Sequence, residues 1–185
     1  MSYYVRLMHE DDTAQVAEID RETFPSQWPP VNYERELQSW LAHYIVACEE
    51  SDEPPPPGKE YIIGFASFWM MADKAHITNL AVRETHRRRG MGELLLISMI
   101  DLARELNAYS LTLEVRASNI AAQSLYGKYG FIRAGLRRRY YTDNREDAVL
   151  MSTESISSTS FQSLLNWLKK THSKKWGIAL YQVAP

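Results

Sequence analysis

The segment from residue 75 to residue 106 limits what this chain can fold into more than any other part of it. Ala75 to Val82 is rich in apolar and β-branched residues, which is typical of a strand. A charged segment with two glycines, 83–92, follows it. Apolar residues then recur at helical spacing through Leu95, Met99, Leu102 and Leu106. This order predicts a strand, a loop and a helix in immediate succession.

Length and composition favour one domain in a reducing compartment. The chain has 185 residues, 45% of them hydrophobic, which suffices for one sizeable core. Its net charge of -2 provides no general attraction to nucleic acid or membranes. The single cysteine, Cys48, excludes an internal disulfide, so we expect a cytoplasmic protein. The start, 1–6, has no apolar export segment, and the densest apolar run, 94–100, is far too short for a membrane span.

The segments before residue 75 alternate between strand and helix patterns. A strand around Val5 precedes a helix that begins at Asp11 and ends at Phe24-Pro25. After a proline-containing loop, a second amphipathic helix is indicated by the spacing of Tyr33, Leu37, Trp40 and Leu41. Two strands, 44–49 and 61–70, are joined by an extended loop that contains Pro54 to Pro57.

The segments after residue 106 predict a strand, a helix and a closing pair of strands. Polar and apolar residues alternate from Tyr109 to Val115, and Glu114 lies on the polar face. The next helix has Ser118 as its expected N-cap and Gly130 at its C-terminal end. Two further strands are expected at 131–141 and 147–151.

The composition changes after Met151. Residues 152–160 are mostly Ser and Thr, and apolar residues then recur at helical spacing. We therefore divide the chain into a domain at 1–151 and an extension at 152–185 that carries a short amphipathic helix. The extension has four lysines and one glutamate. The sequence leaves open whether this helix docks on its own domain or on a partner, such as a ribosome or a second subunit.

The first chemical motif is the loop Arg87-Arg88-Arg89-Gly90-Met91-Gly92, between the predicted strand and helix. Glycines allow backbone N–H groups to approach a pyrophosphate, the helix dipole adds positive potential, and arginines add charge-assisted hydrogen bonds. A solvated basic turn is the alternative. A Walker loop is excluded, because no Gly-Lys-Ser/Thr follows.

A second motif, Leu113-Glu114-Val115-Arg116-Ala117-Ser118-Asn119, precedes Leu125-Tyr126 and Gly130-Phe131. With the arginine and glycine loop, this order and spacing resembles the GNAT superfamily of N-acetyltransferases. The run from Leu113 to Phe131, followed by Tyr140-Tyr141 and Arg145-Glu146-Asp147-Ala148, resembles the RimI-type ribosomal-protein alanine N-acetyltransferases. The resemblance covers about residues 3–151. It implies an α/β GNAT fold, in which a central mixed, mostly antiparallel sheet of six or seven strands has splayed parallel strands and is flanked by helices.

The resemblance also implies acetyl-CoA as cosubstrate. Strand backbone would contact the pantetheine arm and the thioester, the glycine loop would wrap the pyrophosphate, and Asn119 would face the cofactor. The expected cofactor-binding residues are Leu80, Ala81, Val82, Arg87, Arg88, Arg89, Gly90, Met91, Gly92, Glu93 and Asn119. Glu93 departs from the family, which usually has a basic residue there, and so removes one favourable charge.

The same resemblance makes Glu114 the general base and Tyr126 the general acid. By themselves, a strand glutamate is more often solvated and a helix tyrosine more often part of a core. The α-amine of a protein N-terminus, with a pKa of ~7.7–8.0, is easier to deprotonate than a lysine at ~10.4. A carboxylate base therefore favours an N-terminal substrate. Phe24, Pro25, Tyr140 and Tyr141 match positions that line a peptide entrance in related enzymes, although core or strand-edge packing is an equal alternative.

The sequence supports the remaining candidate sites less strongly. Arg137 to Arg139 beside tyrosines are interpreted as a solvated strand edge rather than a nucleic-acid site. Cys48 is expected to be an inert buried thiol. The five histidines lack ligand spacing, so no metal site is proposed. They are His9, His43, His76, His86 and His172.

The sequence therefore predicts acetyl transfer to a protein N-terminus, by analogy that of a small-subunit ribosomal protein. We expect a monomer or a weak homodimer that binds neither nucleic acid nor membrane. Two alternatives stay open: a broader N-terminal, lysine or small-amine acetyltransferase, and a noncatalytic acyl-CoA-binding or ribosome-associated module.

Overall fold

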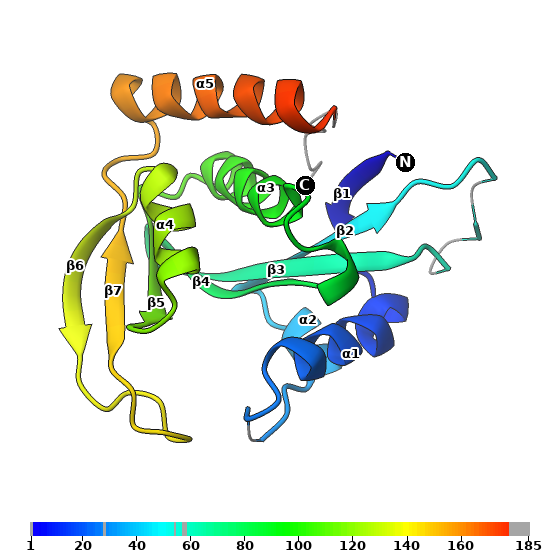
Figure 1. Ribbon diagram of the computed structural model, residues 1–185, viewed down its shortest axis with the longest axis horizontal. Helices are drawn as coiled ribbons and strands as arrows, with labels where there is room; N and C mark the ends of the chain where they lie inside the picture. The colour runs from blue at the N-terminus through cyan, green and yellow to red at the C-terminus, as the bar shows by residue number, and fades with distance from the viewer. Residues whose placement is uncertain (1, 28, 54, 57–58, 178–185) are drawn as a thin grey trace.

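The computed structural model describes residues 2–27, 29–53, 55–56 and 59–177. Within them, one sheet of seven strands has the order β1-β2-β3-β4-β5-β7-β6 (Figure 1). The strands are β1 (Tyr3–Leu7), β2 (Ala42–Glu49), β3 (Ile62–Met71), β4 (Lys74–Val82), β5 (Ser110–Arg116), β6 (Ile132–Arg137) and β7 (Ala148–Ser152). All neighbours are antiparallel except β4 and β5. The expected mixed, mostly antiparallel sheet is confirmed.

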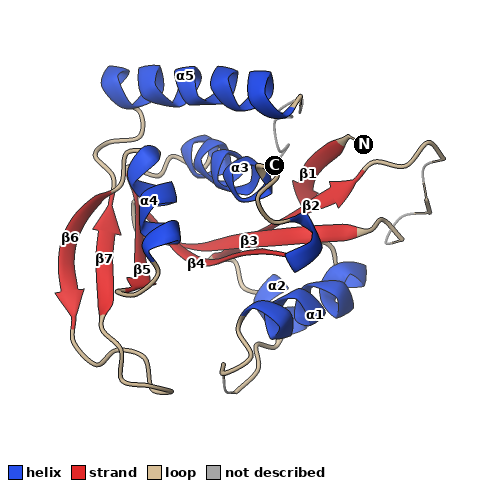
Figure 2. Ribbon diagram, in the orientation of Figure 1, coloured by secondary structure: helices blue, strands red, loops and turns tan. Residues whose placement is uncertain are grey.

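Helices cover both faces of this sheet (Figure 2). They are α1 (Thr13–Thr23), α2 (Tyr33–Leu37), α3 (Met91–Glu105), α4 (Ile120–Lys128) and α5 (Thr159–Trp176), with 3-10 turns η1 (Glu10–Asp12) and η2 (Glu84–His86). In β2, Ile45 and Ala47 belong to the core under α3, whereas Val46 and Cys48 belong to the core under α1 and α2. Because successive side chains of a strand point to opposite faces, alternate residues of β2 pack into two different apolar layers. Cys48 is a buried free thiol, as expected.

The parallel pair opens into a wedge. β4 and β5 are paired only from Lys74 to His76, opposite Ser110 to Thr112. Further along, β4 stays on β3 and β5 stays on β7, so the two strands diverge. A register shift in the β3–β4 ladder leaves Thr78 as an extra residue at this point, because Ser67 pairs with Asn79 and Phe68 with Ile77. The wedge is where the expected splayed strands lie.

Two local predictions were wrong. The second helix ends at Leu37 and not at Leu41, because the chain turns to start β2 at Ala42, and Trp40 is 85% exposed in that turn. The N-cap of α4 is Asn119 rather than Ser118, because Asn119 Oδ1 accepts the Ala122 N–H. The Ser118 hydroxyl instead donates to Glu146.

The helix of the extension is longer than expected. α5 has 18 residues and begins at the N-cap Ser158, whose hydroxyl accepts the Phe161 N–H. Its buried residues Phe161, Leu165 and Leu168 share the core cluster that contains α3. The helix therefore docks on the rest of the chain. The predicted loop at Pro54 to Pro57 lies partly outside the described residues.

Candidate active site

The loop between β4 and α3 brings backbone N–H groups and arginines together at a helix start. Arg88 (φ 62°) and Gly90 (φ 78°) both have left-handed backbone, which curls the chain into the helix start. Gly90 is the N-cap of α3 and supplies no side-chain cap. The first N–H groups of the helix, from Met91 to Glu93, therefore lack intrahelical partners and lie at the positive end of the helix dipole. These groups and two exposed arginines suit a phosphate.

The charges around this loop leave the arginines available. Arg87 Nε donates to the Val82 carbonyl at 3.0 Å, which folds that side chain onto the end of β4. Arg88 and Arg89 are exposed and form no ion pair with a described residue. The loop thus retains uncompensated positive charge on its outer side.

Glu93, the departure from the family pattern, is already neutralised. Its carboxylate is 2.9 Å from Lys128 Nζ and 2.6 Å from the Tyr129 hydroxyl. Burial raises the pKa of Glu93, but hydrogen bonds from Tyr129 and Lys128 outweigh burial, so the pKa lies below its ordinary value. These contacts link α3 to the end of α4. The positive charge of Lys128 offsets the repulsion between Glu93 and a phosphate.

Leu80, Ala81 and Val82 lie on the β4 side of the wedge. They pair with Ala66, Phe65 and Gly64 of β3 and have no partner on β5. Strand backbone at that edge is therefore open to an extended ligand, as the pantetheine arm would be. Asn119 lies across the wedge at the start of α4, where its Oδ1 is engaged in capping. Its predicted contact with the cofactor stays a prediction.

Glu114 lies on β5 just past the last residue paired with β4. Its side chain is 12% exposed, with Oε2 2.7 Å from His76 Nε2 and Oε1 3.6 Å from Arg137 Nε. His76 Nδ1 is 2.7 Å from the Thr112 hydroxyl. A neutral ring that donates from Nε2 to Glu114 accepts at Nδ1, so Thr112 and Glu114 together select one tautomer.

Sequence reasoning missed His76, because it considered histidines only as metal ligands. His76 and Glu114 lie 38 positions apart and meet across the one parallel pair of strands in the described part of the chain. The sequence signal that could have found it is period-two alternation, which puts His76 between Ala75 and Ile77 and so on the polar face of β4.

Tyr126 brings a hydroxyl to the same region. The residue is 7% exposed, and its ring packs against Phe131 with centroids 5.4 Å apart. Its hydroxyl has no hydrogen-bond partner among the described residues. Burial and the neighbouring Tyr141 raise the pKa of Tyr126 to about 12. Burial also raises the pKa of Tyr141 to about 12, with Arg116 opposing and Glu114 adding to the shift. Tyr141 therefore interacts electrostatically with both predicted catalytic residues.

Two loops meet at the mouth of the wedge. Ser26, next to Phe24 and Pro25, donates its hydroxyl to Asp143 Oδ2 at 2.9 Å, which joins the loop after α1 to the loop between β6 and β7. Arg116 also binds Asp143 at 2.9 Å and lies over the Tyr141 ring at 3.9 Å. Phe24 is 38% and Tyr140 44% exposed, so the predicted entrance aromatics are accessible to solvent. Their contact with a substrate stays a prediction.

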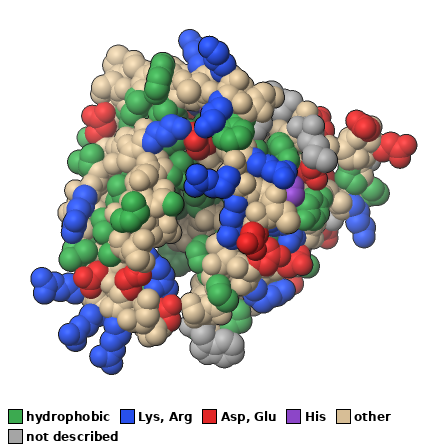
Figure 3. All heavy atoms as spheres, viewed as in Figure 1, with side chains coloured by type: hydrophobic (Ala, Val, Ile, Leu, Met, Phe, Trp, Pro, Cys, Tyr) green, Lys and Arg blue, Asp and Glu red, His purple; other side chains and the backbone are tan. Residues whose placement is uncertain are grey.

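Figure 3 shows the resulting hollow in the middle of this face, with Lys and Arg side chains along its upper and right-hand edges.

In the part of the chain that the structure describes, no group of three or more His, Cys, Asp or Glu residues is placed to hold a metal ion. Within the same part, no helix combines the length and apolar character that crossing a membrane requires.

In this protein, the parallel pair of a mixed sheet diverges beside a basic, glycine-containing helix start. This is the arrangement expected of an α/β acyltransferase. The model of the acetyltransferase (GNAT) family matches residues 13–131. The chain belongs to this family and is an acetyltransferase.

Known proteins resemble it over most of its length. A Bacillus subtilis protein called "Putative ribosomal protein bS18-alanine N-acetyltransferase" is 38% identical over 148 residues, 80% of this chain and 92% of that protein. The Mycobacterium tuberculosis N-alpha-acetyltransferase RimI is 33% identical over 150 residues, 78% of this chain and 87% of that protein. The crystal structure of the Escherichia coli ribosomal-protein-S18-alanine N-acetyltransferase has a TM-score of 0.68 at 28% identity and covers 85% of this chain and 97% of that one. The resemblance to RimI-type enzymes is thereby confirmed.

Proposed function

We propose that this protein transfers the acetyl group of acetyl-CoA to the N-terminal α-amino group of a small-subunit ribosomal protein in the cytoplasm. The Glu114 carboxylate carries the proposal, because it lies past the last paired residues of the wedge, hydrogen-bonded to His76 and interacting electrostatically with the Tyr141 phenol. The names of the B. subtilis and E. coli relatives support an N-terminal alanine of protein bS18 as the substrate.

The residues of the phosphate loop fit acetyl-CoA. The N–H groups from Met91 to Glu93 and the side chains of Arg88 and Arg89 would hold the pyrophosphate, and the open edge of β4 would hold the extended arm. When bound, acetyl-CoA supplies an activated acyl group as a thioester. Fixing both phosphate and arm would hold the thioester in the wedge near Glu114.

Glu114 takes the proton of the incoming ammonium group. Deprotonating an α-amine at pH ~7 costs only ~1 kcal/mol, against ~4.6 kcal/mol for a lysine, so a carboxylate suffices for the former. His76 acts as a positioning residue: its 2.7 Å bond to Oε2 holds the carboxylate toward the wedge and leaves Oε1, 3.6 Å from Arg137, to face the amine. The neutral amine then attacks the thioester carbonyl and the C–S bond breaks, while the second proton of the nitrogen passes to the departing sulfur, so no covalent enzyme intermediate is required.

Tyr126 stabilises the departing sulfur. At a pKa of about 12 its hydroxyl keeps its proton at neutral pH. Complete transfer to a thiolate of pKa ~8.5 is uphill by ~5 kcal/mol, so Tyr126 serves mainly as a hydrogen-bond donor to developing negative charge. That is a weaker role than the full general acid expected from an ordinary tyrosine.

Replacing Tyr126 by phenylalanine should therefore lower kcat by about 10- to 100-fold, less than the ~100-fold or more that a full acid–base group contributes. The Michaelis constants should change little, because the ring still packs against Phe131. Steady-state kinetics with both substrates varied would check this. A kcat within about twofold of wild type would remove Tyr126 from the mechanism.

The substrate class is tested by CoA release with three acceptors: a peptide with a free N-terminal alanine, the same sequence N-terminally blocked and carrying a lysine, and a small amine. We expect turnover with the free α-amine at least ~100-fold above the blocked peptide, in keeping with the ~3.6 kcal/mol difference in deprotonation cost. Preferred acetylation of the blocked lysine peptide would replace the N-terminal proposal by a lysine one.

A broader N-terminal specificity is the second candidate. The M. tuberculosis relative is named only as an N-alpha-acetyltransferase, and that name does not specify one substrate. Peptides that differ only in their first residue separate the two. A strong preference for alanine supports the narrow function, and equal rates support the broad one.

A further inference from the structure

α5 lies outside the part of the chain that the family model matches, yet it is fixed along its length to α3. Lys169 Nζ is 2.7 Å from Asp101 Oδ1, and Arg104 donates to Gln162 at 2.9 Å. The apolar side between these contacts is buried against α3. Because α3 begins at the phosphate loop, the position of α5 relative to that loop is also determined.

The C-terminal end of α5 contacts the loop at Gly90 through a polar and an aromatic side chain. His172 Nε2 is 2.9 Å from the Gly90 carbonyl oxygen, so the ring donates a hydrogen bond to it. The Trp176 ring lies so close to Gly90 that a Cβ there would be 2.6 Å from it. The Gly90 carbonyl also accepts the Leu94 N–H at 3.0 Å. This one carbonyl therefore accepts two hydrogen bonds, one from each helix.

The double contact at the Gly90 carbonyl sets the direction of the next N–H. A peptide unit is planar and trans, so the N–H of Met91 points opposite to the Gly90 carbonyl. Because His172 binds that carbonyl from α5, the Met91 N–H is aimed away from His172. That N–H is one of the unpartnered donors at the start of α3.

The environment of His172 indicates more than ordinary packing. The residue is 2% exposed, and its Nδ1 is buried without a hydrogen-bond partner among the described residues. Leaving a buried nitrogen unpaired is unfavourable, and an apolar residue would avoid it. The polar contact that the ring does make is the one to Gly90.

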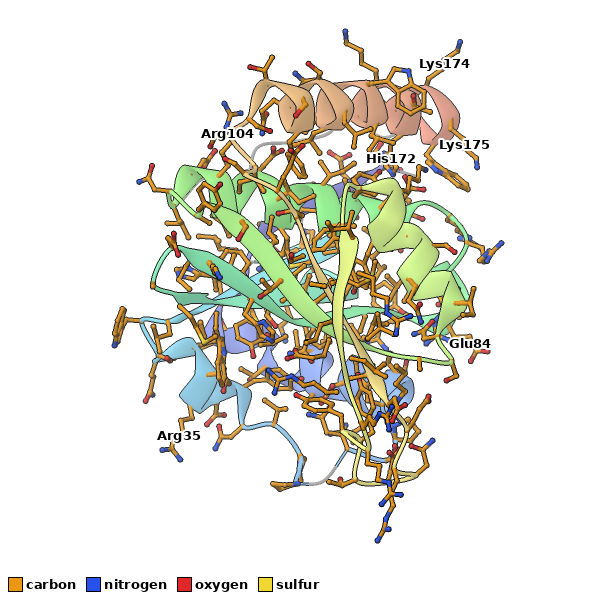
Figure 4. All side chains as sticks on the ribbon, turned by 90° about the vertical axis from the view of Figure 1, so that its left-hand side faces the viewer. Arg35, Glu84, Arg104, His172, Lys174 and Lys175 are labelled. Atoms are coloured by element: carbon orange, nitrogen blue, oxygen red, sulfur yellow. The ribbon has the colours of Figure 1, made fainter. Side chains whose placement is uncertain are left out.

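The last turn of α5 also brings positive charge to this side. Lys175 Nζ is 4.8 Å from the centre of the Trp176 ring, and Lys175 forms no ion pair with a described residue. Figure 4 shows His172 pointing into the molecule, Lys174 pointing away above α5, and Lys175 on the same side of the molecule as Glu84, the first residue of η2. Lys175 therefore lies over the ring that packs against Gly90.

We propose that α5 completes the phosphate site for acetyl-CoA. His172 and Trp176 are positioning residues that hold the Gly90 peptide so that the Met91 N–H faces a phosphate, and Lys175 adds a cation beside it. This proposal rests on acetyl-CoA as the donor, but it does not depend on which amine is acetylated.

The first test measures CoA binding to the full chain by calorimetry, with no acceptor present. His172→Phe keeps an aromatic ring but removes the donor, and His172→Gln keeps an N–H at about the same reach. We expect CoA affinity to fall about five- to tenfold in His172→Phe and to stay within about twofold in His172→Gln, as for the loss and retention of one hydrogen bond. Thermal unfolding of both variants verifies that each is folded.

The outcomes separate a positioning role from a packing role. Equal weakening in both variants would show that His172 only fills space, and wild-type affinity in both would overturn the proposal. In kinetics, His172→Phe should raise the KM for acetyl-CoA while the KM for the peptide stays the same. If wild type binds CoA but acetylates no N-terminal peptide, the function proposed above fails while this binding series still decides the role of α5.

The charge is tested by a matched pair, Lys175→Ala and Lys174→Ala. Lys175→Ala should weaken CoA binding about two- to threefold at low salt, and the difference should vanish at high salt, because an exposed charge is screened. Lys174→Ala should bind as wild type does. Equal effects of the two changes would show that Lys175 acts only through the general charge of the surface. That result would contradict its part in the site.

Discussion

Replacing Glu114 by glutamine is expected to lower kcat for an N-terminal alanine peptide by about 100- to 1000-fold, the range of a lost general base. Glutamine has the shape of glutamate and can still accept the hydrogen bond from His76, so the site keeps its geometry. It cannot take the proton of the ammonium group. The loss should therefore appear in kcat, with the KM for acetyl-CoA unchanged.

The pH dependence of this variant distinguishes a base from a structural residue. Above the α-amine pKa of ~8.0 the substrate is already deprotonated, so the deficit of Glu114→Gln should shrink as the pH rises toward ~9. Glu105→Gln is the matched control, because Glu105 is exposed at the end of α3. Steady-state rates across this pH range decide the matter. A deficit that is the same at every pH would assign Glu114 to structure, and a deficit under about threefold would remove it from catalysis.

The largest effect on stability is expected at Asp12. Its side chain is 1% exposed and forms a two-pronged pair with Arg6, with Oδ2 2.7 Å from Nη1 and Oδ1 3.0 Å from Nη2. Oδ2 also accepts the His9 N–H at 2.8 Å. Asp12→Asn leaves the mostly buried Arg6 without its main partner, which should cost about 3–5 kcal/mol of unfolding free energy. Urea unfolding measures this directly.

The control is Asp11→Asn, the same change at the exposed neighbouring position, which should alter stability by less than about 0.5 kcal/mol.

Burial raises the pKa of Asp12, but hydrogen bonds from Arg6 and the His9 N–H outweigh it and hold the pKa below its ordinary value. A lowered pKa stabilises the fold above the unfolded value of ~3.9 and loses that contribution as the pH falls through the folded value. The difference between wild type and Asp12→Asn should thus be constant from about pH 5 to 7 and shrink below about pH 4. A difference under about 1 kcal/mol at neutral pH would contradict the assignment.

The sequence alone predicted those parts of the site whose geometry is local. Ala75 to Leu106 form strand, loop and helix because their spacing matches those periods, and Gly90 stands where a left-handed residue begins the helix. Glu114 was expected on the polar face of its strand, and it does face away from the apolar core formed by Leu113 and Val115. Period and turn chemistry act over a few residues, so one chain is enough to reveal them.

Only the tertiary structure decided the contacts between segments that are distant in the chain. His76 meets Glu114 because β4 and β5 are parallel and pair at Thr112, which no local pattern encodes. Gly90 meets His172 because α5 packs along α3. Local spacing was equally unable to show where the helix at Tyr33 stops, since the start of β2 ends it. The sequence thus determined the elements and their polar faces, whereas packing determined which polar groups meet, because those contacts depend on where whole elements are placed against one another.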